Sequence, residues 1–408
     1  MRVAIWTFGC RLNFAETEEL IELLNKKRFD ISFKKPQIII IRGCSVTKKA
    51  EKETRIKINK LRKKGKRTLI IAAGCLRKNF YCPSADLIFF KQKEGEILKK
   101  LENFRDQNLK NLPQAPVEKL PKLRTRSFIK IQDGCENYCA YCLVPFLRGK
   151  EKSKPENEII KKIKEKEKNG YQEIVLTGVN IGKWKEGEKD FIWLVKKILA
   201  ETKIPRIRIS SLWPDVLDKK FITLFKNRRL CRHLHLSLQS LSQSVLKRMN
   251  RSYRVKNIKE KIKKIKFFLP DLSISADLIV GFPGETEEEF KKTVENVKKI
   301  GLAKIHVFRY SPRENTTAAL MKDQVKDNVK KRRSNILISL SKRLNKKWRK
   351  NFISQTREIL FEQKKDAFWR GLTDNYLKVY LSGEDDYGNK ILSVKIIKIY
   401  QDGLLGKI

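Results

Sequence analysis

The stretch Phe128-Ile-Lys-Ile-Gln-Asp-Gly-Cys135-Glu-Asn-Tyr-Cys139-Ala-Tyr-Cys142 joins a short apolar run to three closely spaced cysteines. Their CxxxCxxC spacing supplies three thiolates and no fourth. Three thiolates on a four-iron cluster leave one iron open, and an open iron can activate a substrate, whereas a fully ligated cluster mainly stores or passes electrons. Structural zinc is nearly always held by four ligands. The segment therefore predicts a strand that delivers the cluster-binding loop of an enzyme.

Strand and helix patterns alternate after this loop. The expected strands are 128–132, 173–177, 206–210, 233–238, 273–280 and 304–308, and helical patterns over 156–168, 192–201 and 287–299 separate some of them. Such repeats predict an α/β fold, here a partial (β/α)6 barrel over residues 125–350. The loop follows the first strand at its carboxyl end, where the active site of a barrel lies.

The region before the loop repeats one pattern, in which an apolar run ends in Gly-Cys. Cys10, Cys44 and Cys75 each close such a run, and helical segments follow the first two. Strands alternating with helices predict a doubly wound parallel α/β domain over residues 1–112, whose strand ends share one edge. We expect the three cysteines to converge there, and Cys82 and Cys231 to be structural. Asn13 is expected to cap the first helix, with Glu16 three residues later.

The C-terminal region has a different character. Prolines among polar residues over 105–124 predict a linker, and a basic helix is expected over 328–350. Short alternating runs broken by glycines then predict a small antiparallel β-barrel over 351–408. Trp369, Tyr376 and Tyr380 lie there among basic residues and could stack on unpaired RNA bases, although such aromatics can equally fill a barrel core.

The charge balance favours a polyanionic partner. The chain has 408 residues, with 93 Lys+Arg against 46 Asp+Glu and a net charge of +47. Nucleic acid is the obvious partner, although lysine-rich solvated helix faces would give the same balance. No apolar run reaches the length of a membrane span, and nothing resembles a signal peptide. We expect a soluble cytoplasmic protein, in whose reducing setting the eight cysteines are poor candidates for disulfides and better candidates for metal or catalytic ligands.

Together these motifs resemble the radical S-adenosylmethionine (SAM) methylthiotransferases. The three-cysteine N-terminal domain, the CxxxCxxC loop and a C-terminal barrel similar to the TRAM RNA-binding module carry the resemblance over essentially the whole chain. The segments 128–135, 206–211 and 231–240 are most similar to the MtaB-type enzymes, which methylthiolate C2 of N6-threonylcarbamoyladenosine-37 of tRNA. Sister types modify N6-isopentenyladenosine-37 of tRNA or an aspartate of ribosomal protein S12, and both remain alternatives.

The resemblance implies two 4Fe-4S clusters and SAM. Cys135, Cys139 and Cys142 would hold the cluster that cleaves SAM to a 5'-deoxyadenosyl radical, because the C2–H bond of adenine is beyond the reach of an acid or base. Cys10, Cys44 and Cys75 would hold the auxiliary cluster that presents sulfur. The SAM-binding positions carried over by resemblance are Tyr141, Thr177, Gly178, Asn180, Ser237, Gln239, Ile279, Gly281 and Glu285.

The implied partners are the anticodon loop of tRNA, an electron donor and a sulfur source, with the chain acting as a monomer. Three positions depart from the usual sequence pattern of the family and leave the subtype open: Arg42-Gly43, which stands before Cys44, Leu241, and Arg309. The alternative hypothesis is a non-catalytic RNA-binding protein whose cysteines hold structural zinc or a structural cluster.

Overall fold

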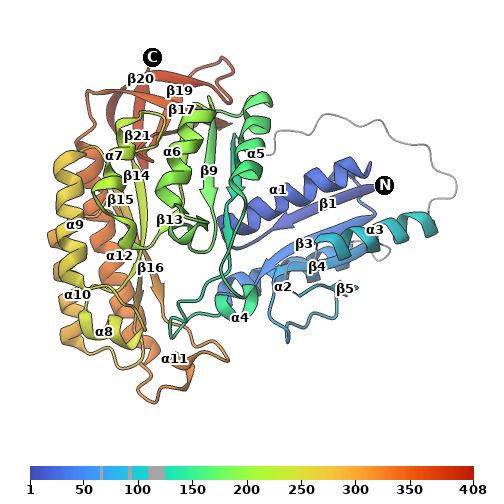
Figure 1. Cartoon of the computed structure of the whole chain (residues 1–408), viewed down its shortest axis with the longest axis horizontal. Helices are drawn as coiled ribbons and strands as arrows, with labels where there is room; N and C mark the ends of the chain where they lie inside the picture. Colours follow the sequence, from blue (N-terminus) through green and yellow to red (C-terminus); the bar gives the residue numbers. More distant parts are fainter. Residues whose placement is uncertain (65–67, 91–93, 109–124) are drawn as a thin grey trace. The chain divides into compact units, whose positions relative to one another are not determined.

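A computed structural model describes residues 1–64, 68–90, 94–108 and 125–408 (Figure 1). The chain divides into two compact units. The first unit comprises Met1–Leu123, Asp133–Glu136 and Cys142–Glu151; the second comprises Arg124–Gln132, Asn137–Tyr141 and Lys152–Ile408. In the described residues, no helix is both long and apolar enough to cross a membrane.

The first unit is built on a parallel sheet with strand order β2-β1-β3-β4-β5. Its strands are β1 (Arg2–Thr7), β2 (Asp30–Ile31), β3 (Ile38–Cys44), β4 (Leu69–Cys75) and β5 (Leu87–Ile88), and its helices are α1 (Arg11–Lys26), α2 (Lys48–Lys64), α3 (Glu94–Asn108) and α4 (Val144–Arg148). The three Gly-Cys runs form β1, β3 and β4, as predicted. The linker expected over 105–124 begins inside α3, and its remainder, 109–124, lies outside the described residues.

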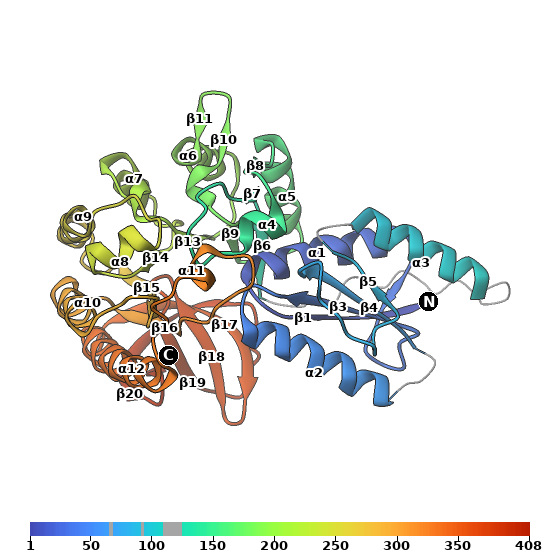
Figure 2. The same cartoon turned by 90° about the horizontal axis from the view of Figure 1, so that it is seen from below.

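Successive side chains of each strand point to opposite faces, so the runs of isoleucine build two separate cores. Ile38 and Ile40 pack with α1 and α3, while Ile39 and Ile41 pack with Ile58 of α2 on the other face. Figure 2 shows α2 on one side of the sheet and α1 and α3 on the other. The predicted doubly wound arrangement is confirmed.

The second unit contains two parallel sheets, β12-β9-β6 and β13-β14-β15-β16. The strands are β6 (Arg126–Lys130), β9 (Glu173–Thr177), β12 (Arg206–Ile209), β13 (Ser211–Leu212), β14 (His233–Gln239), β15 (Ser273–Val280) and β16 (Lys304–Arg309). An isolated parallel bridge between Ile207 and Leu230 connects β12 to the segment before β14. The six predicted strand positions are present, and these sheets stay open, as in a partial barrel.

The helices of this unit are α5 (Glu156–Lys168), α6 (Phe191–Glu201), α7 (Lys219–Thr223), α8 (Gln243–Arg248), α9 (Val255–Phe268), α10 (Glu287–Ile300), α11 (Thr317–Leu320) and α12 (Asp327–Lys350). The longer helices cover the outside of the strands, whereas the short α11 lies inside their ring (Figure 2). One continuous apolar core joins the strands to the buried faces of α5, α6, α9 and α10. The active face of the unit is therefore left to the loops at the strand ends.

A closed barrel of order β17-β18-β19-β21-β20 follows α12. Its strands are β17 (Thr356–Lys365), β18 (Phe368–Thr373), β19 (Lys378–Ser382), β20 (Ile391–Tyr400) and β21 (Gly403–Lys407). The barrel was predicted to be antiparallel, but β19 and β21 pair in parallel. Five strands cannot close with alternating directions all the way round, so one neighbouring pair must run the same way.

The three aromatic residues considered for RNA stacking are held by other parts of the protein. Trp369 and Tyr380 are buried, with Trp369 in the barrel core. Tyr376 stacks on His233, with ring centroids 4.5 Å apart. Of the two alternatives, core packing therefore holds for Trp369, because a barrel of this size needs large side chains to fill its interior. Tyr380 lies outside that core and packs against Tyr400.

Candidate functional site

In the first unit, the three Gly-Cys sequences lie at the carboxyl ends of β1, β3 and β4. Cys44 and Cys75 are register partners on adjacent strands, and Cys10 caps α1 directly after β1. Gly9 has φ +97°, and a Cβ built on it would lie 2.7 Å from the Cβ of Cys44. Only glycine tolerates both that backbone conformation and that approach. The expected convergence of Cys10, Cys44 and Cys75 on one sheet edge is therefore present in the fold.

Asn13 plays a different part from the helix cap that was predicted. The cap residue of α1 is Cys10, and Asn13 lies within the helix. Its amide Nδ2 donates to the carbonyl oxygens of Phe8 at 2.7 Å and Gly43 at 2.9 Å. Asn13 thus connects the ends of β1 and β3 beside the cysteines. A carbonyl of a neighbouring strand outcompeted the local capping interaction.

Glu16 is likewise drawn away from the cap and into a buried ion-pair network. Its Oε2 lies 2.9 Å from Nη2 of Arg42, and its Oε1 lies 2.8 Å from Nη1 of Arg148. Arg42 also pairs with Glu94 at 2.8 Å, and Arg148 pairs with Asp133 at 3.0 Å. Each buried charge therefore has an opposite partner, which burial requires. The network also gives Arg42 a structural role, since this residue departs from the usual sequence pattern of the family and pairs with both Glu16 and Glu94.

The three sulfurs of the first unit are in unlike electrostatic environments. A hydrogen bond from Cys44 is the largest cause that lowers the pKa of Cys75 to about 7, and the guanidinium of Arg148 acts in the same direction, against burial. The same hydrogen bond, with burial, raises the pKa of Cys44 well above its usual value. Cys75 is thus prepared as a thiolate, the form in which cysteine binds metal.

The three sulfurs are not all equally close to one another. Among the described residues, His235, Asp277 and His306 are the group whose ligand atoms all lie within 4.8 Å of one another, so at least one distance within the Cys10, Cys44 and Cys75 set is larger. Cys44 and Cys75 are nevertheless close enough to share a hydrogen bond.

The CxxxCxxC loop contributes residues to both units. Cys135 and Cys142 belong to the first unit and Cys139 belongs to the second. Cys135 and Cys139 are buried, and Cys142 is half-buried. The backbone N–H of Val144 donates to Sγ of Cys142 at 3.4 Å, and Nη1 of Arg251 donates to Sγ of Cys139 at 3.6 Å. Both sulfurs therefore accept a hydrogen bond from the protein.

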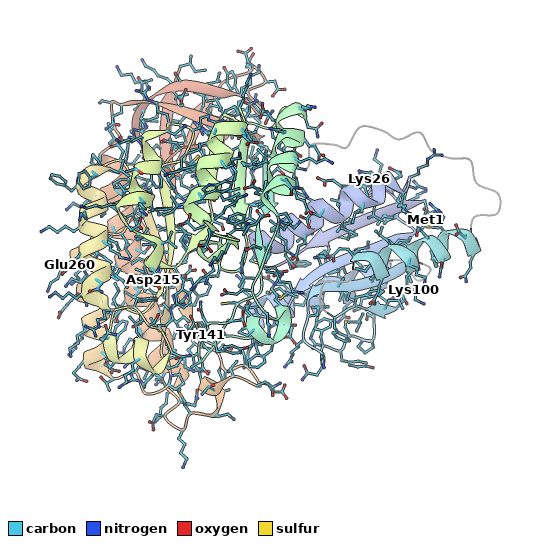
Figure 3. The ribbon with its side chains drawn as sticks, in the orientation of Figure 1. Met1, Lys26, Lys100, Tyr141, Asp215 and Glu260 are labelled. Carbon is cyan, nitrogen blue, oxygen red and sulfur yellow. The ribbon has the colours of Figure 1, made fainter. Side chains whose placement is uncertain are left out.

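Tyr141 and Ile279, two of the predicted SAM-binding residues, pack in one apolar cluster of the second unit. The ring of Tyr141, labelled in Figure 3, stands edge-on to Phe282 with centroids 6.5 Å apart. Its hydroxyl lies 3.4 Å from Nη1 of Arg251. Tyr141 thereby becomes part of the surroundings of Cys139.

The end of β9 forms a second predicted part of the site, with Thr177, Gly178 and Asn180. Oε1 of Gln132 accepts from the backbone N–H of Asn180 at 2.8 Å, and a Cβ on Gly178 would lie 2.6 Å from the carbonyl oxygen of Gln132. Thr177 and Asn180 are buried. Among the residues that the structure describes, Nδ2 of Asn180 has no hydrogen-bond partner. A buried amide donor of this kind is costly unless a ligand accepts from it.

The ends of β14 and β15 supply the other predicted residues. Oγ of Ser237 donates to the carbonyl oxygen of Leu212 at 3.1 Å, and Gln239 has φ +62°, an uncommon conformation for a residue other than glycine. Glu285 is turned toward the protein, because its Oε2 accepts from the N–H of Gly281 at 2.6 Å and from Arg333 at 2.8 Å. Its carboxylate thus braces the turn after β15.

The three histidines of the chain meet in the second unit, a feature that was not predicted. Nε2 of His235 lies 3.0 Å from Oδ1 of Asp277, and Nδ1 of His306 lies 3.7 Å from the same oxygen. Nδ1 of His235 is 2.8 Å from Oγ of Ser275. Both ring nitrogens of His235 are therefore engaged, and the group is held together without an ion. The His-x-His sequence of β14 was the available signal.

Arg251 and Arg148 were also missed, and no local pattern could have singled them out among so many basic residues. The side chain of each is buried beside a cysteine of the expected sets. Arg251 donates a hydrogen bond to Cys139, and Arg148 acts to lower the pKa of Cys75. Cys82 and Cys231, predicted to be structural, are both buried, and burial raises the pKa of Cys231 to about 12. A buried neutral thiol of this kind packs as a small apolar group.

Family models match the two regions that carry the cysteine sets. Residues 129–297 match the radical SAM superfamily, and residues 2–82 match the family described as uncharacterized protein family UPF0004. The fold and the CxxxCxxC loop thus define a member of the radical SAM superfamily.

Relatives extend over almost the whole chain. The chain is 34% identical to threonylcarbamoyladenosine tRNA methylthiotransferase MtaB of Bacillus subtilis, over 97% of this chain and 94% of that protein. The MtaB protein of Thermotoga maritima is also 34% identical, over 99% of this chain and 96% of the relative. A tRNA-2-methylthio-N(6)-dimethylallyladenosine synthase of Thermodesulfovibrio yellowstonii is 33% identical, over 100% and 98%. The chain belongs to the radical SAM methylthiotransferases and is of the MtaB type.

Solved structures share the fold at low sequence identity. The radical SAM methyltransferase TsrM of Kitasatospora setae aligns with a TM-score of 0.56 at 12% identity, over 78% of this chain and 77% of TsrM. The cobalamin-dependent radical SAM enzyme OxsB aligns with a TM-score of 0.51 at 12% identity, over 78% of this chain and 54% of OxsB. These likenesses support the α/β arrangement alone.

Proposed function

We propose that this chain is a tRNA-modifying transferase that methylthiolates C2 of N6-threonylcarbamoyladenosine-37 and yields 2-methylthio-N6-threonylcarbamoyladenosine. The observation that carries the proposal is its similarity, over nearly the full length, to proteins of that activity. The reaction needs one group that generates a radical and another that supplies sulfur. Two cysteine trios, each associated with the carboxyl ends of parallel strands, match that need.

We assign two 4Fe-4S clusters and SAM to these trios. Cys135, Cys139 and Cys142 are the proposed ligands of the cluster that supplies radical chemistry with SAM, and Cys10, Cys44 and Cys75 are the proposed ligands of the auxiliary cluster. Two observations support the fit: Arg251 contacts Cys139, and Arg148 acts to lower the pKa of Cys75. A cluster with three thiolates carries net negative charge, which the guanidinium of Arg251 would offset.

The protein residues around the loop have the task of binding and orienting SAM. We assign the unpartnered Nδ2 of Asn180 to a polar group of SAM, and Tyr141 to its adenine. Gly178 leaves room for the backbone of the β9 end to approach Gln132. Thr177, Ser237, Gln239, Ile279 and Gly281 complete the proposed pocket, and Glu285 supports it by holding the Gly281 turn.

The proposed division of labour has three domains. Residues 1–112 would carry the auxiliary cluster, residues 125–350 the radical SAM centre, and residues 351–408 a TRAM-like module that binds the anticodon loop. Because Trp369 and Tyr380 are buried, we assign RNA contact to exposed lysines of the barrel, namely Lys364, Lys365, Lys395 and Lys398. Lysines on such a surface bind phosphates rather than bases. The proposed setting is a cytoplasmic monomer that receives electrons and sulfur from other components.

The experiment that tests this function uses anaerobically reconstituted protein, SAM, a reductant and a sulfide source. One tRNA would carry N6-threonylcarbamoyladenosine at position 37 and a second would carry N6-isopentenyladenosine. Mass spectrometry of the digested nucleosides should find the methylthio product of the first tRNA. A C139A variant should give none. Product with neither tRNA, from protein that holds both clusters, would contradict the proposal.

The isopentenyladenosine substrate is the second candidate, because a relative named for that activity is 33% identical over the whole chain. Selective modification of the second tRNA would favour it. The S12 alternative is tested by the same reaction with purified ribosomal protein S12, followed by mass measurement of its peptides. A purified protein with zinc and no iron would instead favour a non-catalytic RNA-binding role.

A further inference from the structure

Arg251 is a buried cation without a carboxylate partner. Its side chain makes no ion pair with Asp or Glu anywhere in the part of the chain that the structure describes, and 6% of the residue is exposed. Nε donates to the hydroxyl of Tyr253 at 2.8 Å, and Nη2 donates to the carbonyl oxygen of Ser237. The guanidinium carbon lies 3.6 Å from the ring centroid of Trp213. All of these partners are neutral.

A buried charge of this kind needs a counter-charge nearby. The remaining nitrogen, Nη1, points at Sγ of Cys139 at 3.6 Å and at the hydroxyl of Tyr141 at 3.4 Å. A cluster bound to Cys139 would be the anion available at that place. Arg148 and Arg208, which also lie near cysteines, contrast with this arrangement, because Glu16 and Asp133 balance the charge of Arg148 and Glu173 pairs with Arg208.

The backbone holds Arg251 against the loop. The carbonyl oxygen of Met249 accepts from the N–H of Ala140 at 3.0 Å, and Nδ2 of Asn250 donates to the carbonyl oxygen of Tyr138 at 3.0 Å. The two residues before Arg251 are thus bonded on both sides of Cys139. Tyr253 adds rigidity, since its hydroxyl donates to the carbonyl oxygen of Leu238 at 2.6 Å.

From these contacts we propose that Arg251 is a positioning residue that raises the reduction potential of the cluster held by Cys139. Reduction adds one electron to an already anionic group. A fixed cation and an N–H···S hydrogen bond both favour the more negative, reduced form, and hydrogen bonds to sulfur and local charge set the potentials of such clusters. Arg251 thereby makes the cluster easier to reduce. The inference rests on the proposed function, because it requires a cluster at this loop.

The test is a redox titration of the full-length, anaerobically reconstituted protein, followed by electron paramagnetic resonance. Two cluster transitions are expected, and the one perturbed by added SAM belongs to the CxxxCxxC loop. R251M keeps much of the side-chain volume and removes the charge. It should lower the reduction equilibrium constant of that transition at least tenfold, which for one electron is about 59 mV toward negative potential. The other transition should stay in place.

Two further variants separate charge from shape. R251K keeps the charge and should lie closer to the wild type than R251M does. K247M removes an exposed positive charge from α8, four residues away in sequence, and should leave both potentials unchanged. If R251M does not assemble the loop cluster, assembly in R251K but not in R251Q would show the same need for a cation.

Three results would overturn the inference. The first is an R251M protein with two clusters and unchanged potentials. The second is unchanged potentials with weaker SAM binding, which would make Arg251 a partner of the SAM carboxylate instead. The third is an equal shift in K247M. A wild-type protein without a SAM-sensitive cluster signal would refute the proposed function itself.

Discussion

Replacing Glu16 by Gln should loosen the first unit by about 3 kcal/mol. The carboxylate is 1% exposed and lies between two buried arginines, Arg42 at 2.9 Å and Arg148 at 2.8 Å. Removing one partner of a buried ion pair costs about 3 to 5 kcal/mol, because the remaining charge stays buried. The lower end of that range applies here, since Glu94 still pairs with Arg42 and Asp133 still pairs with Arg148.

Glutamine is an informative replacement because it keeps the shape of glutamate but replaces one of the two acceptor oxygens with a donor NH2 group. The carboxylate presents two acceptors to the two guanidinium groups, with Oε2 also 3.3 Å from Nη2 of Arg148. A glutamine amide presents one acceptor and one donor, and the donor must face a guanidinium N–H. At least one buried donor therefore loses its acceptor, which alone costs about 1 to 3 kcal/mol.

The assay is anaerobic amide hydrogen exchange of β1 and β3, whose ends Asn13 and Arg42 connect. A loss of about 3 kcal/mol corresponds to roughly a hundredfold faster exchange where the amides exchange through opening of the unit and reclosing is faster than exchange, at 1.4 kcal/mol for each factor of ten. Iron content must be equal in both proteins, because a bound cluster would itself stabilise the unit.

The matched control is E102Q. Glu102 pairs with Lys27 at 2.9 Å, but their side chains are 28% and 53% exposed, so this pair should contribute less than about 1 kcal/mol. If exchange in β3 of the E16Q protein rises less than tenfold, or no more than in E102Q, the network does not hold the cysteine edge together.

The other predictions concern the second unit. In W369A, the loss of a core aromatic should destabilise the barrel by about 3 to 5 kcal/mol, seen as a lower thermal midpoint; an unchanged midpoint with weaker tRNA binding would instead restore a stacking role. In G178A, a Cβ 2.6 Å from the carbonyl oxygen of Gln132 should displace the end of β9 and weaken SAM binding measured by calorimetry, while G95A, with open space around its Cβ, should not. N180A should weaken SAM binding without lowering the thermal midpoint, because Nδ2 has no protein partner to lose; equal SAM affinity would argue against that contact. Burial opposes ionisation of Glu289, but hydrogen bonds from Arg248, Ser244 and Thr286 outweigh it and lower its pKa to about 2. Its stabilising contribution is therefore present above about pH 4.5 and lost toward pH 2, so E289Q should flatten acid unfolding across that window, as followed by circular dichroism.

The sequence predicts the strands that end in the Gly-Cys pairs, β1, β3 and β4, but it does not predict the edge strands β2 and β5. Runs such as Ile38 to Ile41 are buried on both faces, which only a central parallel strand allows, and the Gly-Cys that follows marks where the run must stop. β2 and β5 have two residues each, too few for any periodicity to appear. Edge strands of this kind are set by the register of the strand beside them.

Side-chain roles were less predictable than strands, and Asn13 and Glu16 show the physical reason. Their spacing at the start of a helix is typical of a capping box. Both side chains instead bond to groups about 30 residues away in sequence, the carbonyl oxygen of Gly43 and the guanidinium of Arg42. Tertiary partners that a local pattern cannot contain decided the outcome. The Thr286 and Glu289 pair at the start of α10 has the same spacing, and there the capping box forms although Arg248 and Ser244 also bind the Glu289 carboxylate. A distant partner therefore does not exclude a capping box where the side chain can still reach the backbone N–H.

The large positive charge is used in two ways that composition alone does not separate. Several arginines are buried and bind internal acceptors: Arg206 donates to carbonyl oxygens of the C-terminal barrel, and Arg208 pairs with the buried Glu173. The planar guanidinium suits such fixed, multiple hydrogen bonds better than an ammonium does. These arginines hold the fold together and are out of reach of a polyanion. The attraction to tRNA must therefore come mainly from exposed lysines, and it should depend on their arrangement more than on the total of +47.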